Sequence, residues 1–85
     1  MSAAPIVTVF LRPGCHLCGQ ALETLARIQQ DLPFALESVD IESDAALHAR
    51  YLERIPVVTL AGDELYDFFV DEADLRLRLA PRGAR

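Results

Sequence analysis

Two cysteines separated by two residues constrain this chain more than any other feature. Cys15 and Cys18 follow a short apolar run at 6–11 and stand at the start of a helical pattern. On a first helical turn, residues three apart face the same side, which brings the Cα atoms to roughly 5–6 Å, within the range of a disulfide. The unpaired N–H groups and partial positive charge at a helix start stabilise a thiolate. The spacing therefore predicts a redox site where a strand turns into a helix.

The composition is that of one small, acidic globular domain covering residues 1–85. The chain carries 13 Asp and Glu against 8 Arg, has no Lys, and has a formal net charge of −5. Binding to nucleic acid requires clustered positive charge that neutralises phosphates. The arginines are scattered along the chain, so we expect no nucleic-acid partner.

The hydropathy pattern predicts no membrane partner. No apolar stretch approaches the ~20 residues of a membrane span. The N-terminus lacks the basic start, apolar segment and cleavage site of a secretory signal. We therefore expect a cytoplasmic location, where a Cys-x-x-Cys pair is more often catalytic or metal-binding than structural.

Hydrophobic periodicity and turn residues predict seven elements of secondary structure. We expect strands at 6–11, 34–41, 55–60 and 65–70, and helices at 15–31, from Ser43 or Asp44 to about 52, and at 71–79, flanked by tails at 1–5 and 81–85. The second strand does not alternate cleanly, which suits the edge of a sheet. The third strand opens with a proline, a position that strands tolerate. A turn at 61–64 joins the last two strands in a hairpin.

This order predicts an α/β fold with the sequence βαβαββα. The first strand and the second should be parallel, because a helix connects them. The hairpin should be antiparallel, giving a four-stranded mixed sheet with helices on both faces. Four aromatic side chains, those of Tyr51, Tyr66, Phe68 and Phe69, are expected to pack in or against this sheet.

The chain resembles a glutaredoxin, a minimal thioredoxin fold, over nearly its whole length. The resemblance is carried by Cys15-His16-Leu17-Cys18 at the start of the first helix, by the proline in Ile55-Pro56-Val57, and by the order of the elements. It is greatest to small glutaredoxin-like proteins with a Cys-His-Leu-Cys motif. The resemblance implies a thiol–disulfide oxidoreductase that needs no metal or bound prosthetic group.

The two cysteines are the expected catalytic residues. Cys15 lies nearer the helix start, so it is the expected nucleophile, and the resemblance implies that Cys18 resolves the mixed disulfide. The alternative is a pair of inert, buried cysteines. A zinc site would need four ligands, and only Cys15, Cys18, His16 and His48 could supply nitrogen or sulfur, without a suitable His pair. We therefore expect no metal.

Four further residues are candidates for substrate binding. Arg12, where the family commonly has Lys, could favour the thiolate or hold a substrate carboxylate, or it could be a solvated charge. His16 could stabilise the thiolate as a cation or point into solvent. The resemblance implies that Pro56 is a cis-proline and that the backbone of Ile55 pairs with an extended substrate, as in strand addition.

The resemblance is weakest for glutathione. Glutaredoxins usually carry a Gly-Gly pair just before the last helix, followed by acidic residues. This chain has Phe68-Phe69-Val70-Asp71-Glu72-Ala73-Asp74 there, without the glycines, so a ligand backbone could not approach in the same way. One of the acidic residues Asp71, Glu72 and Asp74 could still hold a ligand's amino group. The expected role of Asp71 is nevertheless a helix cap, and the other two are expected to favour the helix N-terminus electrostatically. Glutathione, another low-molecular-weight thiol or a flavin reductase could each recharge the cysteines.

Two functions of different classes follow. The first is a monomeric enzyme that reduces protein or small-molecule disulfides by dithiol exchange. The second is a thioredoxin-fold binding module whose cysteines no longer turn over. Iron–sulfur assembly between two chains, known for some relatives, is a third possibility.

Overall fold

The computed structural model describes residues 4–80. Its elements, in chain order, are β1 (Ile6–Leu11), α1 (His16–Asp31), β2 (Ala35–Asp40), the 3₁₀ helix η1 (Ile41–Ser43), α2 (Ala45–Tyr51), β3 (Val57–Leu60), β4 (Asp63–Asp67) and α3 (Glu72–Leu79). The predicted order is confirmed, with η1 as the one element that the sequence pattern did not predict.

The four strands form one mixed sheet in the order β2-β1-β3-β4. β1 runs parallel to β2 and antiparallel to β3, and β3 pairs antiparallel with β4. The central strand β1 buries Val7 and Val9 completely. The predicted edge position of β2 is confirmed, and its weak apolar pattern follows from having only one neighbouring strand.

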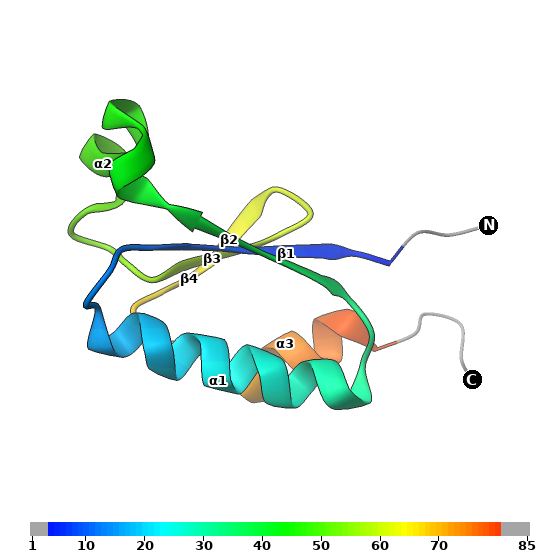
Figure 1. Cartoon of the computed structure of the whole chain (residues 1–85). Coiled ribbons are helices and arrows are strands. Elements are labelled where there is room, and N and C mark those ends of the chain that lie inside the picture. The colour runs from blue at the N-terminus through cyan, green and yellow to red at the C-terminus, as the bar shows by residue number, and fades with distance from the viewer. Residues whose placement is uncertain (1–3, 81–85) are drawn as a thin grey trace.

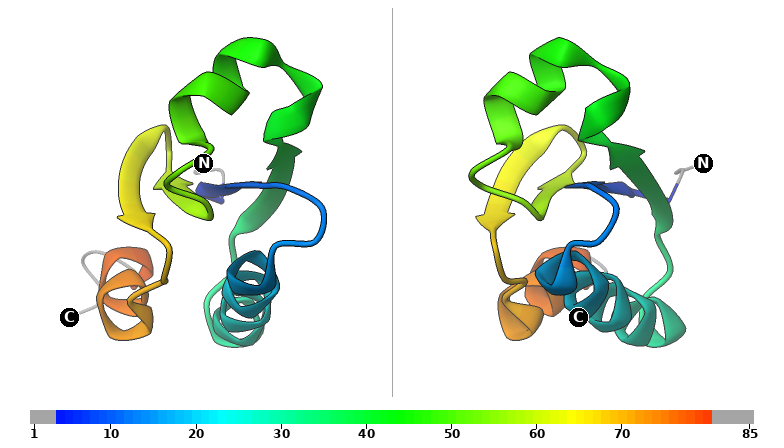
Figure 2. Two further views of the ribbon diagram at one scale, coloured as in Figure 1. Left: turned by 90° about the vertical axis from the view of Figure 1, so that its left-hand side faces the viewer. Right: turned by 60° about the vertical axis from the view of Figure 1, so that its left-hand side comes forward.

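Helices cover both faces of the sheet, as predicted. Figure 1 shows α1 and α3 beneath the sheet, and α2 above it at the end where β1 meets α1. Viewed from that end, α1 and α3 lie side by side (Figure 2, left). The larger apolar cluster lies between these two helices and the sheet, and its fully enclosed members include Val7, Val9, Leu25, Ile28 and Leu75.

The sequence of α1 explains both its length and its buried face. Ala21, Leu25 and Ile28 recur at intervals of three and four, so they lie on one side of the helix and pack against the sheet. Pro33 follows the C-cap residue Leu32 and prevents the helix from continuing. A short connection at 12–15 joins the carboxyl end of β1 to the N-terminal end of α1.

The hairpin is tighter than the sequence pattern predicts. A two-residue turn at Ala61 and Gly62, with φ of 51° and 90°, joins β3 to β4. Positive φ at both positions is typical of a hairpin turn whose twist matches that of the strands. The prediction of a four-residue turn and a strand at 65–70 was therefore wrong, and β4 ends at Asp67.

β3 is also shorter than predicted, because its pairing with β1 begins at Val57. Pro56 has no N–H to donate to a ladder, and it precedes the strand instead of opening it. Asp44 caps α2 by accepting N–H groups from Ala46 and Leu47, which confirms one of the two predicted cap positions. Asp71 caps α3 in the same way, as predicted.

Candidate functional site

Cys15 and Cys18 lie where β1 turns into α1, and they form a disulfide with a Cα–Cα distance of 5.2 Å. Cys15 is the N-cap residue of α1, and its Sγ accepts the backbone N–H of Cys18 at 3.2 Å. Cys15 therefore takes the place that Ser or Asp occupies at most helix starts. This geometry directs a helix-end N–H at the sulfur, as the motif predicts for a stabilised thiolate.

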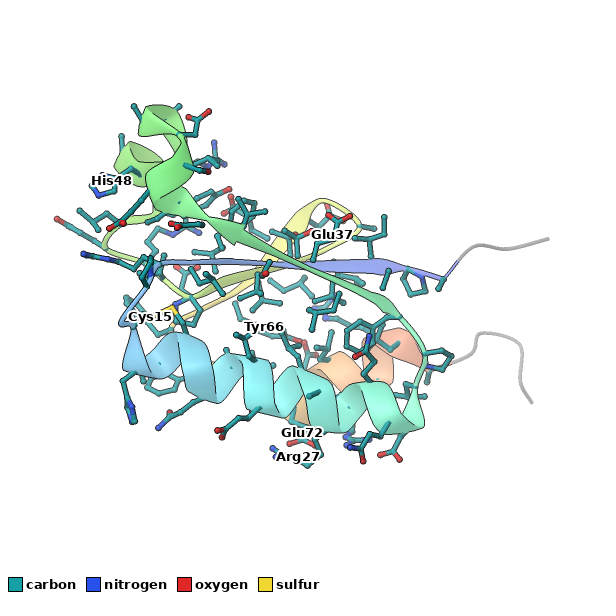
Figure 3. All side chains as sticks on the ribbon, viewed as in Figure 1. Cys15, Arg27, Glu37, His48, Tyr66 and Glu72 are labelled. Atoms are coloured by element: carbon teal, nitrogen blue, oxygen red, sulfur yellow. A yellow bond between two sulfur atoms is a disulfide. The ribbon has the colours of Figure 1, made fainter. Side chains whose placement is uncertain are left out.

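The two sulfur-bearing residues differ in exposure. Cys15 is half-buried at the edge of the molecule, at the N-terminal end of α1 (Figure 3). Cys18 is only 3% exposed and packs in a second apolar cluster with Tyr51, Ile55 and Val57. Cys15 is therefore the more accessible of the two cysteines, and Cys18 lies on its inner side.

Ile55 and Pro56 are buried beside the cysteines, and the peptide bond between them is cis. Ile55 belongs to the same apolar cluster as Cys18, against which Cys15 also packs. Within residues 4–80, neither the N–H nor the C=O of Ile55 has a hydrogen-bond partner. Both groups are therefore available for hydrogen bonding, and the substrate-binding role expected of Ile55 stays a prediction.

Arg12 and His16 are engaged elsewhere. The Arg12 guanidinium lies 3.3 Å from the Glu42 carboxylate in an exposed ion pair. His16 is exposed on the first turn of α1, where its Nε2 accepts the Gln20 side-chain amide at 3.1 Å. Neither side chain makes a hydrogen bond to either sulfur in the described part of the chain. Their predicted roles in substrate binding stay predictions.

A charged network fixes the segment before Pro56. The Arg54 guanidinium donates to both Asp67 oxygens at 3.0 Å and to Glu64 at 2.7 Å. Glu64 also accepts the Tyr51 hydroxyl at 2.8 Å and the Arg50 guanidinium at 3.0 Å. Hydrogen bonds from Arg54, Tyr51 and Arg50, in that order of importance, lower the pKa of Glu64 from 4.5 to about 2. These hydrogen bonds connect β4 to Arg54, the residue that precedes Ile55, and so restrict the position of the Ile55 backbone.

We expect this network to make stability depend on pH below neutrality. The pKa of Glu64 is lower in the folded chain than in the unfolded chain, so its contribution is complete above about 4.5 and is lost as pH falls toward about 2. The difference in free energy of unfolding between wild type and Glu64→Gln should therefore be largest at pH 6 and shrink between pH 4.5 and pH 2.5. Urea unfolding at several pH values measures it, and a difference that does not change with pH contradicts the assignment.

Phe68 and Phe69 are the functional candidates that the sequence pattern missed. The prediction that they pack against the sheet was wrong, because the chain leaves the sheet after Asp67, and their exposed fractions are 42% and 66%. Tyr51 and Tyr66 do pack as predicted, and Tyr66 lies between the sheet and the helix layer (Figure 3). Together with Val70, the two phenylalanines line one side of a cleft of about 90 Å³, whose other side is formed by Leu17, Gln20, Ala21 and Thr24 of α1.

The described part of the chain has neither a candidate metal site nor a candidate membrane span. Across residues 4–80, no three side chains of His, Cys, Asp or Glu gather in an arrangement suited to a metal ion. None of the helices in that range has both the length and the apolar character needed to cross a membrane.

Comparisons with known proteins place these features in a family. A solved structure from X. campestris is 42% identical with a TM-score of 0.70, and the match covers 88% of this chain and 99% of that one. A solution structure from Nitrosomonas europaea has a TM-score of 0.81 at 28% identity, covering 94% of this chain and 96% of that one. An uncharacterized protein of Mycobacterium tuberculosis is 35% identical over 81 residues, which are 89% of this chain and 84% of the relative.

The fold is shared with more distant proteins as well. A thioredoxin from Halobacterium salinarum matches with a TM-score of 0.64 at 18% identity, over 88% of this chain and 71% of that one. The model of the glutaredoxin-like domain (DUF836) matches residues 6–80, which include both cysteines, Pro56 and every element of the sheet. The chain therefore belongs to the glutaredoxin-like domain family and has a thioredoxin-like fold.

Proposed function

We propose that this chain is a thiol–disulfide oxidoreductase that reduces disulfides by dithiol exchange through Cys15 and Cys18. The observation that carries the proposal is the difference between the two cysteines. One sulfur is accessible and receives a helix-end N–H, and the other is buried directly behind it. This difference suits the roles of an attacking thiolate, which must be accessible, and of a resolving thiol, which needs only to reach its neighbour.

The reaction needs only the two cysteine thiols and the substrate disulfide. The Cys15 thiolate attacks one sulfur of the substrate disulfide, and the other substrate sulfur leaves as a thiolate that takes up a proton. The Cys18 thiolate then attacks Cys15 Sγ, breaks the mixed disulfide and releases the second substrate thiol. Two electrons pass to the substrate, and the protein is left with the Cys15–Cys18 disulfide.

The proposal includes a reducing compartment, the cytoplasm, and an electron donor that restores the dithiol. Glutathione, another low-molecular-weight thiol or a flavin reductase would each fulfil that requirement. Comparing the rates at which each donor reduces the Cys15–Cys18 disulfide distinguishes them.

The activation of Cys15 is the first property to test. In Cys18→Ala, the rate of alkylation of Cys15 by iodoacetamide should rise with pH and reach half its maximum well below the ~8.5 of a free thiol. The reason is that the N–H of residue 18 remains in Cys18→Ala and still donates to the sulfur. Mass spectrometry at a series of pH values measures the rate.

Cys15→Ala is the matched control, because its remaining thiol, Cys18, is 3% exposed and should react much more slowly in the folded protein. If the alkylation rate of Cys15 reached half its maximum only at or above the pKa of a free thiol, ~8.5, the proposal would be contradicted. The chain would then be a thioredoxin-fold binding module with inactive cysteines.

A further inference from the structure

Two adjacent aromatic side chains lie exposed next to the redox site. Phe69 is 66% exposed and Phe68 is 42% exposed, whereas most large apolar side chains of the sheet and of α1 pack inward. Large apolar groups that face solvent together are typical of recognition surfaces, because a partner that covers them removes apolar area from water. We call Phe68 and Phe69 the aromatic pair.

The backbone of Phe68 adopts a strained conformation. Phe68 has φ of 69°, a left-handed conformation that glycine adopts far more easily than phenylalanine. Its N–H donates to the Pro56 carbonyl at 2.8 Å, which links the aromatic pair directly to the segment beside the cysteines. A strained, bulky residue at such a position points to a function for its side chain.

The cleft beside the aromatic pair lies along the first turns of α1, the helix that begins at the redox site. Leu17, which lies between the two cysteines in sequence, lines the cleft together with Ala21 and Thr24 on the α1 side. The cleft has a volume of about 90 Å³, and within residues 4–80 no charged residue lines it. An apolar side chain of a substrate could bind in the cleft while the sulfur of the adjacent substrate cysteine reaches Cys15.

The backbone of Ile55 supplies a second contact for the same substrate. Its N–H and C=O, which have no hydrogen-bond partner within residues 4–80, can pair with the main chain of an extended peptide. Main-chain pairing of this kind gives affinity without selecting side chains, so the selection falls to the cleft and the aromatic pair. A polypeptide meets both requirements at once.

The charges around the cleft are unfavourable for glutathione, which carries two carboxylates. Among the residues that the structure describes, the cleft lining has no cation, Arg12 is paired with Glu42, and Arg54 is paired with Glu64 and Asp67. The net charge of −5 adds a repulsive field for an anion.

From these observations we propose that the aromatic pair and its cleft select polypeptide disulfides in which a bulky apolar residue lies next to the cysteine. The inference rests on the proposed function and names its substrate class. The electrons come from the Cys15–Cys18 dithiol, as described above.

The test uses the full chain in its dithiol form and follows a single turnover, so no external reductant is needed. The probes are two disulfide-linked peptide dimers that differ only in having Leu or Ser next to the cysteine. We expect wild type to reduce the Leu peptide at least about tenfold faster, since burial of one Leu side chain is worth that factor or more. In Phe68→Gly/Phe69→Ser the ratio of the two rates should fall to about threefold or less, because most of that apolar contact is lost.

Leu77→Ser is the matched control, because Leu77 is also an exposed apolar residue, at 77%, but lies on α3 outside the cleft. It should keep the wild-type ratio. Phe69→Ser alone should lower the ratio in the same direction, and it leaves Phe68 and its backbone unchanged.

Three results would overturn the inference. Equal rates for the two peptides in wild type would do so, as would a ratio that persists in both aromatic variants. Reduction of 2-hydroxyethyl disulfide by wild type in either case would leave the proposed function standing. If wild type reduces neither the peptides nor 2-hydroxyethyl disulfide, the proposed function fails and the inference fails with it.

Discussion

Cys15→Ser is expected to abolish disulfide reduction, with a loss of roughly 10³-fold or more, because a serine hydroxyl at neutral pH is a far weaker nucleophile than a thiolate. The hydroxyl still suits the N-cap position, since serine is among the preferred residues there. The variant should therefore fold normally, and the loss can be assigned to chemistry. The rate of thiol release from 2-hydroxyethyl disulfide measures the effect.

Cys18→Ser is the matched control for this prediction. It keeps the nucleophile and removes the resolving thiol, so the first step should proceed and the mixed disulfide at Cys15 should accumulate. Mass spectrometry of the quenched reaction detects this adduct by its added mass. Wild-type rates in Cys15→Ser would refute the assignment of the nucleophile, as would an adduct found on Cys18 in the wild-type reaction.

The redox motif is the part of the site that the sequence predicts best. Cys15 and Cys18 are close in sequence, so a single helical turn determines their geometry, and the Pro-Gly dipeptide before them fixes where that turn begins. Ile55 and Pro56 lie close to the cysteines because β3 pairs with β1. The resemblance implied this proximity, but the local sequence pattern alone does not predict it.

Phe68 and Phe69 show why the remainder of the site was not predicted. Local hydrophobicity continues from Leu65 to Val70, which favours one strand over the whole range. In the structure β4 starts two residues earlier than expected and contains an irregularity opposite Val58 and Thr59, and it ends at Asp67. The shift moves both phenylalanines out of the sheet, and it depends on the turn at Ala61 and Gly62.

The ion pairs of Arg54 were also beyond prediction. Glu64 and Asp67 follow Arg54 by 10 and 13 residues, and no periodic pattern links them to it. They meet because β3 and β4 form a hairpin and the segment before β3 folds across it. Such contacts follow from the fold and do not determine it, so a sequence pattern carries little signal for them.

The largest expected effect on stability is that of Leu25→Ala. Leu25 is fully buried where α1 meets the sheet, among Val9, Ile28, Val58 and Leu75. Truncation removes the apolar contacts and leaves a cavity, which costs about 3 kcal/mol for a Leu at such a site. In a domain of this size that loss should lower the melting temperature by roughly 12–24 °C. Thermal unfolding followed by circular dichroism measures it.

Leu77→Ala makes the same chemical change at a residue that is 77% exposed, and it should alter stability by less than about 0.5 kcal/mol. Similar losses in the two variants would contradict the assignment of the core.

The role of Leu25 also bears on the redox site, because α1 carries Leu25 on its buried face and both cysteines at its start. If Leu25 anchors the helix, alkylation of Cys18 in Leu25→Ala/Cys15→Ala should be faster than in Cys15→Ala, since the buried thiol is protected only while α1 stays docked.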